Sequence, residues 1–267
     1  MLMQQLLADT NSATRAAGKA IMQFYQSQYT VADKSPDNPV TDADFAADKL
    51  LHEQLLALLP EAGWLSEETA DDPARLERRL VWVVDPLDGT KEFVMGIPEF
   101  SVSVGLVEDG EPVLAVIYNP PTGELFAAGR GLGVFYNGEP ATVSSRDSLQ
   151  RARVDASRSE VRRGEFEPFD GLFDVNVMGS IAYKLARVAA GQADATWSRG
   201  PKHEWDICAG TLLVLEAGGV CVDLDGRPIR FNKSFPKVNG IIADNGLLHE
   251  GILRAVTEQG AARVDKR

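Results

Sequence analysis

The segment VVDPLDGTKEF, residues 83–93, begins inside the apolar run VWVV and ends among polar residues. A short apolar run of this kind predicts a buried strand. Pro86 restrains the backbone after the strand, and Gly89 allows a conformation that residues with side chains avoid. We therefore predict that the strand delivers Asp85 into a tight turn, where Asp88, three residues later, faces the same point.

The two aspartates and the carbonyl oxygen of Leu87 between them suit Mg²⁺. This ion binds oxygen ligands in octahedral geometry and takes few of them from protein. The alternative is an ordinary β-turn with solvated aspartates, because Asp, Pro and Gly are all common turn residues. The segment by itself leaves both interpretations open.

Three acidic residues elsewhere in the chain are further candidates for the same site. Glu67 lies in WLSEET, Asp206 lies in HEWDICAG at the predicted start of a helix, and Asp44 lies in TDADF in the first turn of another helix. Each has a simpler explanation when it is taken singly. Asp44 and Asp206 would interact favourably with a helix dipole, and Glu67 would be an exposed acid of a surface loop.

The beginning of the chain predicts two helices. Apolar residues at helical spacing indicate that the first thirty residues form a helix. Thr41, with Asp44 three residues later, predicts the N-cap of a second helix, which Pro60 ends. Between the helices, VADKSPDNPV at 31–40 is interpreted as a turn-rich loop.

The rest of the chain divides into two parts of different character. Three strand candidates follow VWVV with short turns between them, which is typical of an antiparallel meander; they are residues 101–107, 113–118 and 124–129. Later, the helical segments GSIAYKLARVAAGQ and EWDICAGTLLVLEAGG alternate with the strand candidates GVCVDL and VNGIIAD, which indicates an α/β arrangement. We predict a boundary near residue 145, with most of the acidic candidates in 1–145 and Asp206 in 146–267.

The composition narrows the classes of function. The chain has 267 residues, 44% of them hydrophobic and 25% charged, and its net charge of −12 argues against binding to a nucleic acid polymer. It contains neither an apolar run long enough for a membrane span nor a secretory signal pattern, so we expect a cytoplasmic protein. The two cysteines, Cys208 and Cys221, are expected to be reduced thiols.

The acidic candidates, with two further dipeptides, resemble the signature of the inositol monophosphatase superfamily. The matching residues are Glu67-Glu68, DPLDGT at 85–90, Gly179-Ser180 and Trp205-Asp206. Their order and spacing follow that magnesium-dependent, lithium-sensitive group along most of the chain. The resemblance implies a layered αβαβα sandwich, a mixture of α+β and α/β, and hydrolysis of a phosphate monoester.

The resemblance also implies a set of magnesium ligands. Two ions would be bound by five groups, namely Glu67, Asp85, the Leu87 carbonyl, Asp88 and Asp206. Asp85 would bridge the two ions, and Asp44 would help to hold a third ion more weakly through water. Thr90 would orient the attacking water together with Asp44 or Glu67.

Further residues are implied for the substrate. The phosphate would lie on the backbone amides of Gly89 and Thr90, with Gly179 and Ser180 nearby. Lys34 lies where the family carries a lysine close to the site. The second part of the chain would complete the substrate pocket, and a homodimer is compatible with the family.

The residues after DGT favour one branch of the superfamily. Lys91-Glu92-Phe93 and the LSEE sequence at 65–68 resemble the 3′(2′),5′-bisphosphate nucleotidases, which act on adenosine 3′,5′-bisphosphate. Arg158, within ASRS at 156–159, is a candidate for binding the non-reacting phosphate, because arginine binds phosphate bidentately. A solvated loop arginine is the alternative. An inositol monophosphatase or a broad sugar-phosphate phosphatase also fits these residues.

Other classes fit less well. A phosphatase that forms an aspartyl phosphate needs one residue between its two aspartates, whereas DPLDGT has two. Asp223-Leu-Asp225 has the right spacing but is better interpreted as a turn at the end of a strand. No G-x-S-x-G sequence supports a serine hydrolase. A non-catalytic protein that binds a ligand on the same fold is the second hypothesis, and the presence of every implied metal ligand argues against it.

Overall fold

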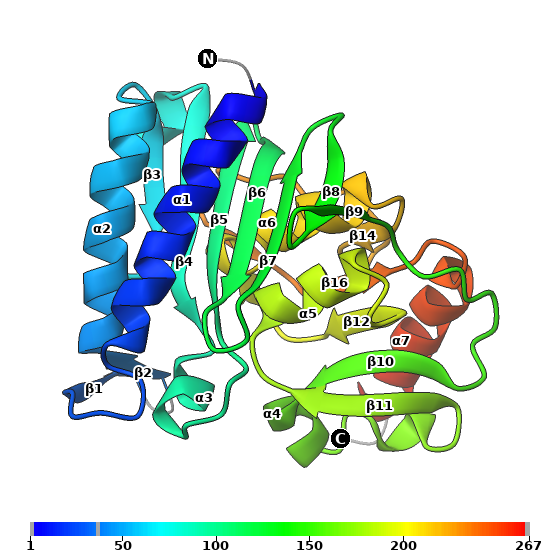
Figure 1. Ribbon diagram of the computed structural model, residues 1–267. Coiled ribbons are helices and arrows are strands. Elements are labelled where there is room, and N and C mark those ends of the chain that lie inside the picture. Colours follow the sequence, from blue (N-terminus) through cyan, green and yellow to red (C-terminus); the bar gives the residue numbers. More distant parts are fainter. Residues whose placement is uncertain (1–2, 36–37, 265–267) are drawn as a thin grey trace.

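The computed structural model describes residues 3–35 and 38–264, and it consists of layers of helices and sheets (Figure 1). Two helices form the first layer, α1 (Met3–Met22) and α2 (Asp42–Leu58). Their order agrees with the sequence prediction, but α1 ends at Met22 and does not extend to residue 30. Thr41 caps α2 by accepting a hydrogen bond from the amide of Ala43. The layers that follow are a sheet, a helix pair, a second sheet and a last helix.

The second layer is a seven-stranded sheet in the order β3-β4-β5-β6-β7-β8-β9. Its strands are β3 (Gly63–Ser66), β4 (Leu80–Asp88), β5 (Ser101–Glu108), β6 (Glu111–Asn119), β7 (Glu124–Gly129), β8 (Gly133–Tyr136) and β9 (Glu139–Ala141). The strands from β4 to β9 pair antiparallel, and β3 is parallel to β4. The predicted meander corresponds to β4 to β7, whereas β8 and β9 were not predicted.

Both faces of this sheet are buried, which explains why its strands are nearly continuous apolar runs. Trp82 and Val84 pack against α1 and α2, whereas Val81 and Val83 pack against the opposite helix pair. That pair forms the third layer and consists of α5 (Ile181–Ala189) and α6 (Glu204–Glu216). Because α5 and α6 lie between two sheets, most of their side chains are buried.

The fourth layer is a five-stranded sheet in the order β11-β10-β12-β16-β14. Its strands are β10 (Ala152–Ser157), β11 (Phe173–Met178), β12 (Ala195–Ser198), β14 (Val220–Val222) and β16 (Ile241–Asp244). Helix α7 (His249–Val264) covers its outer face through Ile252 and Val256, and Leu248, just before the helix, packs with them. The arrangement is the layered αβαβα sandwich that the resemblance implied.

Several shorter elements connect the layers. They are β1 (Val31–Ser35), β2 (Asn38–Thr41), α3 (Thr90–Val94), α4 (Arg158–Arg162), β13 (Lys202–His203), β15 (Lys237–Val238) and two 3₁₀ helices at Pro73–Glu77 and Glu167–Phe169. The expected turn-rich loop at 31–40 is instead an antiparallel ribbon of β1 and β2, and its Pro36 and Asp37 lie outside the described residues. Pairing between the two arms outweighs the low strand propensity of this segment.

Two strands between residues 144 and 179 were not expected from the sequence. This stretch lacks a clear periodicity, yet it contains β10 and β11, which pair parallel. Each strand is short and several side chains of β11 are exposed, so neither produces a strong pattern. The predicted boundary near residue 145 falls in the connection between the two sheets, and the division into subdomains 1–145 and 146–267 stays a prediction.

Three smaller expectations agree with the structure. Both cysteines are buried free thiols. Asp223 accepts hydrogen bonds from the amides of Asp225 and Arg227, so this segment is a turn after β14. Within the described part of the chain, no helix is long and apolar enough to cross a membrane.

Candidate active site

A β-bulge brings the two aspartates of the DPLD segment to one side of the sheet. Asp85 lies opposite Ser103 and Asp88 lies opposite Ser101, so three steps along β4 match two steps along β5. In a regular strand, residues three apart point to opposite faces, and one inserted residue reverses that parity. The predicted tight turn is therefore a bulge within β4. Pro86, which has no N–H group, fits this interrupted ladder.

Two distant segments bring their acids to Asp85. Glu67 follows β3, and its amide donates to the carbonyl of Val84 (3.3 Å), which holds it beside the end of β4. Asp206 lies in the first turn of α6 and accepts a hydrogen bond from the amide of His203 (2.9 Å). One carboxylate oxygen from each of Glu67, Asp85 and Asp206 lies within 4.8 Å of the other two.

The carboxylates of this cluster raise the pKa values of one another. Burial, followed by the negative charges of Glu67, Asp88 and Asp206, raises the pKa of Asp85 well above its usual range. Burial and the same kind of repulsion raise the pKa of Asp206 to about 8. So many acids confined without a cation are electrostatically unfavourable. Their hard oxygen atoms are the ligands that divalent cations of the magnesium type prefer.

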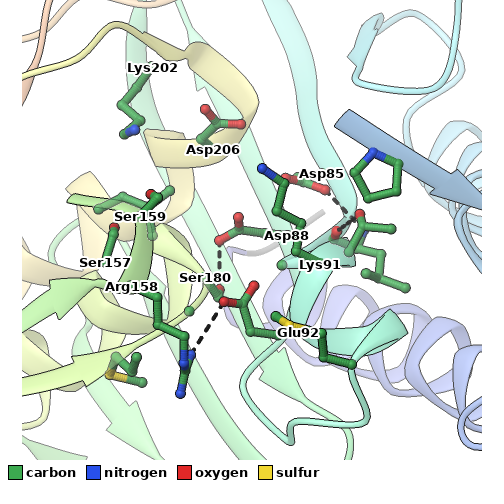
Figure 2. Close-up of a pocket in the computed structure, with 18 of the residues that line it drawn as sticks. Asp85, Asp88, Lys91, Glu92, Ser157, Arg158, Ser159, Ser180, Lys202 and Asp206 are labelled. Atoms are coloured by element: carbon green, nitrogen blue, oxygen red, sulfur yellow. Dashed lines mark hydrogen bonds and ion pairs between the residues drawn. The ribbon is translucent and has the colours of Figure 1, made fainter. Parts of the chain in front are cut away.

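Asp88 belongs to the same cluster but is also bound to the second half of the chain. Its Oδ2 accepts hydrogen bonds from the hydroxyl of Ser180 and from the amide of Ala182, both 2.6 Å long. Burial raises the pKa of Asp88 to about 6, although these two hydrogen bonds oppose the rise. Figure 2 shows Asp85, Asp88 and Asp206 around one side of the pocket, with Ser180 below Asp88.

Thr90 links the DPLDGT segment to the first turn of α2. Its hydroxyl lies 3.1 Å from Asp44 Oδ1 and 3.1 Å from the carbonyl oxygen of Leu87. The other oxygen of Asp44 accepts hydrogen bonds from the amide and hydroxyl of Thr41. Burial raises the pKa of Asp44, while its hydrogen bonds with Thr41 and Thr90 work against that rise. Gly89, which precedes Thr90, has a φ of 101°, a conformation that favours glycine.

Lys34 reaches the site from β1. Its Nζ lies 2.8 Å from Glu67 and 2.5 Å from Glu68, so it partly neutralises the acidic cluster. Burial raises the pKa of Glu68 to about 7, and Lys34 lowers it against that effect. Because Lys34 binds Glu67, a cation in the cluster would compete with this ammonium group for that carboxylate.

Arg158 lines the pocket, but two carboxylates already bind its guanidinium group. Nη1 lies 2.5 Å from Glu99 and 3.3 Å from Glu92. Glu99 also accepts a hydrogen bond from the amide of Gly179 (2.9 Å). A Cβ atom at Gly179 would lie 2.2 Å from the Glu92 side chain, so any larger residue there would displace Glu92 from its present position. Gly179 and Ser180 thus line the pocket as predicted, and their amide and hydroxyl groups bind Glu99 and Asp88.

The pocket has a volume of about 710 Å³ and contains most of the predicted site residues in its wall. Several polar groups around it were not assigned to the site from the sequence, namely Glu92, Glu99, Ser157, Ser159 and Lys184. Lys184 could have been found from the sequence, because helical spacing places this charged residue on the apolar face of α5.

His203 precedes α6, as a capping residue would, and its ring stacks on that of Trp205 with 4.2 Å between the ring centroids.

Comparisons with known proteins agree with this fold and site. The model of the inositol monophosphatase family matches residues 2–261. The chain is 34% identical to Nus factor SuhB of Xylella fastidiosa, covering 94% of each chain. It is also 34% identical to 3′(2′),5′-bisphosphate nucleotidase CysQ of Aggregatibacter actinomycetemcomitans, covering 90% of this chain and 92% of that one. The structure of an IMPase from Thermotoga maritima superposes with a TM-score of 0.84 at 29% identity, covering 94% of this chain and 96% of that one.

The layered fold and the converging carboxylates define a metal-dependent phosphomonoesterase. The chain belongs to the inositol monophosphatase family. Relatives with three different names match at similar identity, so membership of the family does not select one branch within it.

Proposed function

We propose that the protein hydrolyses the 3′-phosphate of a nucleoside 3′,5′-bisphosphate, with adenosine 3′,5′-bisphosphate as the substrate, in a Mg²⁺-dependent reaction. The metal dependence is supported by the closeness of three carboxylates, those of Glu67, Asp85 and Asp206. The residues TKEF after DG, the LSEE sequence and the nucleotidase named among the relatives support the choice of substrate.

Two magnesium ions would be bound by Glu67, Asp85, the Leu87 carbonyl, Asp88 and Asp206, and Asp44 would help to hold a third. When bound, these ions supply positive charge to the phosphate and activate a water molecule. The donor set fits them, because every group in it offers oxygen and the buried carboxylates repel one another. Lys34 supplies only part of the positive charge that would relieve this repulsion.

The residues of the chain itself would position the reactants. Thr90 and Asp44 are hydrogen-bonded, so the threonine hydroxyl has a defined direction from which to hold the attacking water. Glu67, which lies with Asp85 and Asp206 in the acidic cluster, would share this role. The amides of Gly89 and Thr90, at the wall of the pocket, would bind the phosphate, with Gly179 and Ser180 beside it.

The contribution of the threonine hydroxyl is measurable. Thr90→Val is expected to reduce turnover by roughly 100-fold, at the low end of the range for a positioned proton-transfer group. Thr90→Ser keeps the hydroxyl and should retain most of the rate. Initial rates of phosphate release at saturating Mg²⁺ test the pair. Equal losses in both variants would mean that the methyl group or the local packing matters and that the hydroxyl does not.

Two alternatives differ in what they predict. An inositol monophosphatase or broad sugar-phosphate phosphatase would release phosphate from inositol 1-phosphate at least as fast as from the nucleotide. A non-catalytic ligand-binding protein would release none from either ester. The relative named Nus factor SuhB favours keeping this second alternative, because its name is not that of a hydrolase.

The deciding experiment compares initial rates on adenosine 3′,5′-bisphosphate and inositol 1-phosphate, each with Mg²⁺ and with excess chelator. We expect faster turnover of the nucleotide and complete loss of activity with chelator. Activity that survives chelation would contradict the metal site, and faster turnover of inositol 1-phosphate would contradict the substrate. Lithium should inhibit, as the resemblance implies.

A further inference from the structure

The wall of the pocket opposite the acidic cluster carries hydroxyl and ammonium groups. Figure 2 shows Ser157 and Ser159 on that side, across from Asp88, with Lys202 above them and beside Asp206. Lys184 lies directly behind this wall, against Ser157. A pocket with acids on one side and cations on the other suits a ligand that has two separate anionic groups, one of them reached through metal ions.

Lys184 determines the direction of the Ser157 hydroxyl. The lysine is fully buried on α5, and its Nζ donates a hydrogen bond to Ser157 Oγ. Since this bond uses an acceptor position of the hydroxyl, the hydrogen of Ser157 is left to donate elsewhere, and Ser157 borders the pocket. Burying the ammonium group is costly, and the charges of Glu160, Asp88 and Asp155 offset part of that cost.

Lys202 adds a second positive charge to the same wall. Its backbone is held by the pairing of β13 with β15, where Lys202 lies opposite Val238. Among the described residues no ion pair of Lys202 is found, and the residue is only half-buried. Burial lowers the pKa of Lys184, and the positive charge of Lys202 nearby lowers it further. Lys202 also lowers the pKa of Asp206 through its charge, so its ammonium group acts on the acidic residues that border the same pocket.

The other cations at the pocket are less suited to this task. Glu92 and Glu99 already neutralise Arg158. Lys91 and Arg162 are exposed at the rim, where water and salt screen their charges. Lys202 is therefore the half-buried cation of the pocket whose charge is available to a ligand.

We propose that Ser157 and Lys202, supported by Lys184, form a subsite for the second, non-reacting anionic group of the substrate. This inference deepens the proposed function and rests on it. A phosphoryl group is the chemistry that fits, because its oxygen atoms accept hydrogen bonds from a hydroxyl and an ammonium group at once. The 5′-phosphate of adenosine 3′,5′-bisphosphate supplies such a group. Lys202 would thus select a bisphosphate over a monophosphate.

The test compares two substrates that differ only in the second phosphate, adenosine 3′,5′-bisphosphate and adenosine 3′-monophosphate. We expect Lys202→Gln to lower the ratio of their kcat/KM values roughly 10- to 100-fold, the range for losing a charge-assisted hydrogen bond. Ser157→Ala should lower the same ratio by a smaller factor. Lys237→Gln is the matched control, since it removes the same charge from the partner strand β15 and does not border the pocket.

A calorimetric measurement of the affinity for the same two nucleotides, with Ca²⁺ in place of Mg²⁺, tests binding at the subsite independently of hydrolysis. If turnover of the nucleotides is absent but Lys202→Gln weakens binding of the bisphosphate selectively, the proposed function fails and the subsite is supported. If the wild-type protein turns over both nucleotides and Lys202→Gln leaves their ratio unchanged, the subsite is wrong and the function stands. A ratio that falls equally in Lys237→Gln would also overturn the subsite, because general charge would then explain it.

Discussion

Asp85→Asn should reduce phosphate release by roughly 1,000-fold or more, because the charge stabilisation that bound metal supplies is worth several kcal/mol. Asp85 is 2% exposed and lies among Glu67, Asp88 and Asp206, so its carboxylate is the centre of the proposed metal site. The amide oxygen of asparagine is a weaker ligand for Mg²⁺ and carries no net charge. Initial rates over a wide range of Mg²⁺ concentrations measure the loss and show whether excess metal restores any activity.

The same substitution should stabilise the metal-free protein. Ionised Asp85 is repelled by its neighbours and is buried, which is why its pKa is raised well above the usual range. Asparagine removes the charge and keeps the oxygen that accepts the amide hydrogen bond of Leu87. Each kcal/mol of repulsion removed should raise the melting temperature by about 2–4 °C for a chain of this size. The stabilisation by Mg²⁺ should shrink at the same time.

Asp225→Asn is the control for this pair of effects. It makes the same chemical change at an exposed turn, where the carboxylate pairs with Arg227. Both its rate and its melting temperature should stay close to those of the wild type. Near-normal turnover of Asp85→Asn, or a lower melting temperature without metal, would contradict the assignment of Asp85 to the metal site.

A second large effect concerns pH. The metal-free protein should become less stable as the pH rises from about 5 to about 8. In the folded state Asp88 and Asp206 keep their protons up to pKa values of about 6 and about 8. In the unfolded chain aspartates lose them near pH 4. The folded state therefore binds more protons across this window, and the free energy of unfolding falls by about 1.4 kcal/mol per pH unit for each retained proton.

Several other groups modify this slope. The raised pKa of buried Asp85 extends the same trend toward higher pH, and Glu68, with a pKa of about 7, adds to it within the window. The pKa of His203 is lowered by burial and by the charge of Lys237, so in the lower part of the window the unfolded chain binds one proton more there. This single opposing proton is outnumbered by those of the acidic cluster. The net effect is a falling stability.

Mg²⁺ should reverse the trend, because the metal binds the ionised carboxylates and its binding releases protons. The increase in melting temperature caused by Mg²⁺ should therefore grow between pH 5 and pH 8. Calorimetric melting curves at several pH values, with and without Mg²⁺, test this expectation. Asp206→Asn is the informative variant, since it should flatten the metal-free slope. If the melting temperature of the metal-free protein rose with pH instead, groups outside the acidic cluster would control its stability, and this expectation would be wrong.

The local features of the chain were predictable because they depend on neighbours in sequence. The capping of α2 by Thr41 and the four antiparallel strands that begin with VWVV follow from short-range propensity and from apolar runs. The ribbon at β1 and β2 and the short strands β10 and β11 were not predicted, because each exists through pairing with a distant or weakly patterned partner.

The sequence by itself determined which oxygen ligands are available, since Glu67, Asp85, Asp88 and Asp206 could be identified before any fold was known. Only the tertiary structure decided that they meet. A bulge had to turn Asp85 and Asp88 to one side, and helix α6 had to bring Asp206 across from the second half of the chain. Such contacts join residues more than a hundred positions apart, and their formation depends on the packing of whole layers, which local sequence preference does not encode.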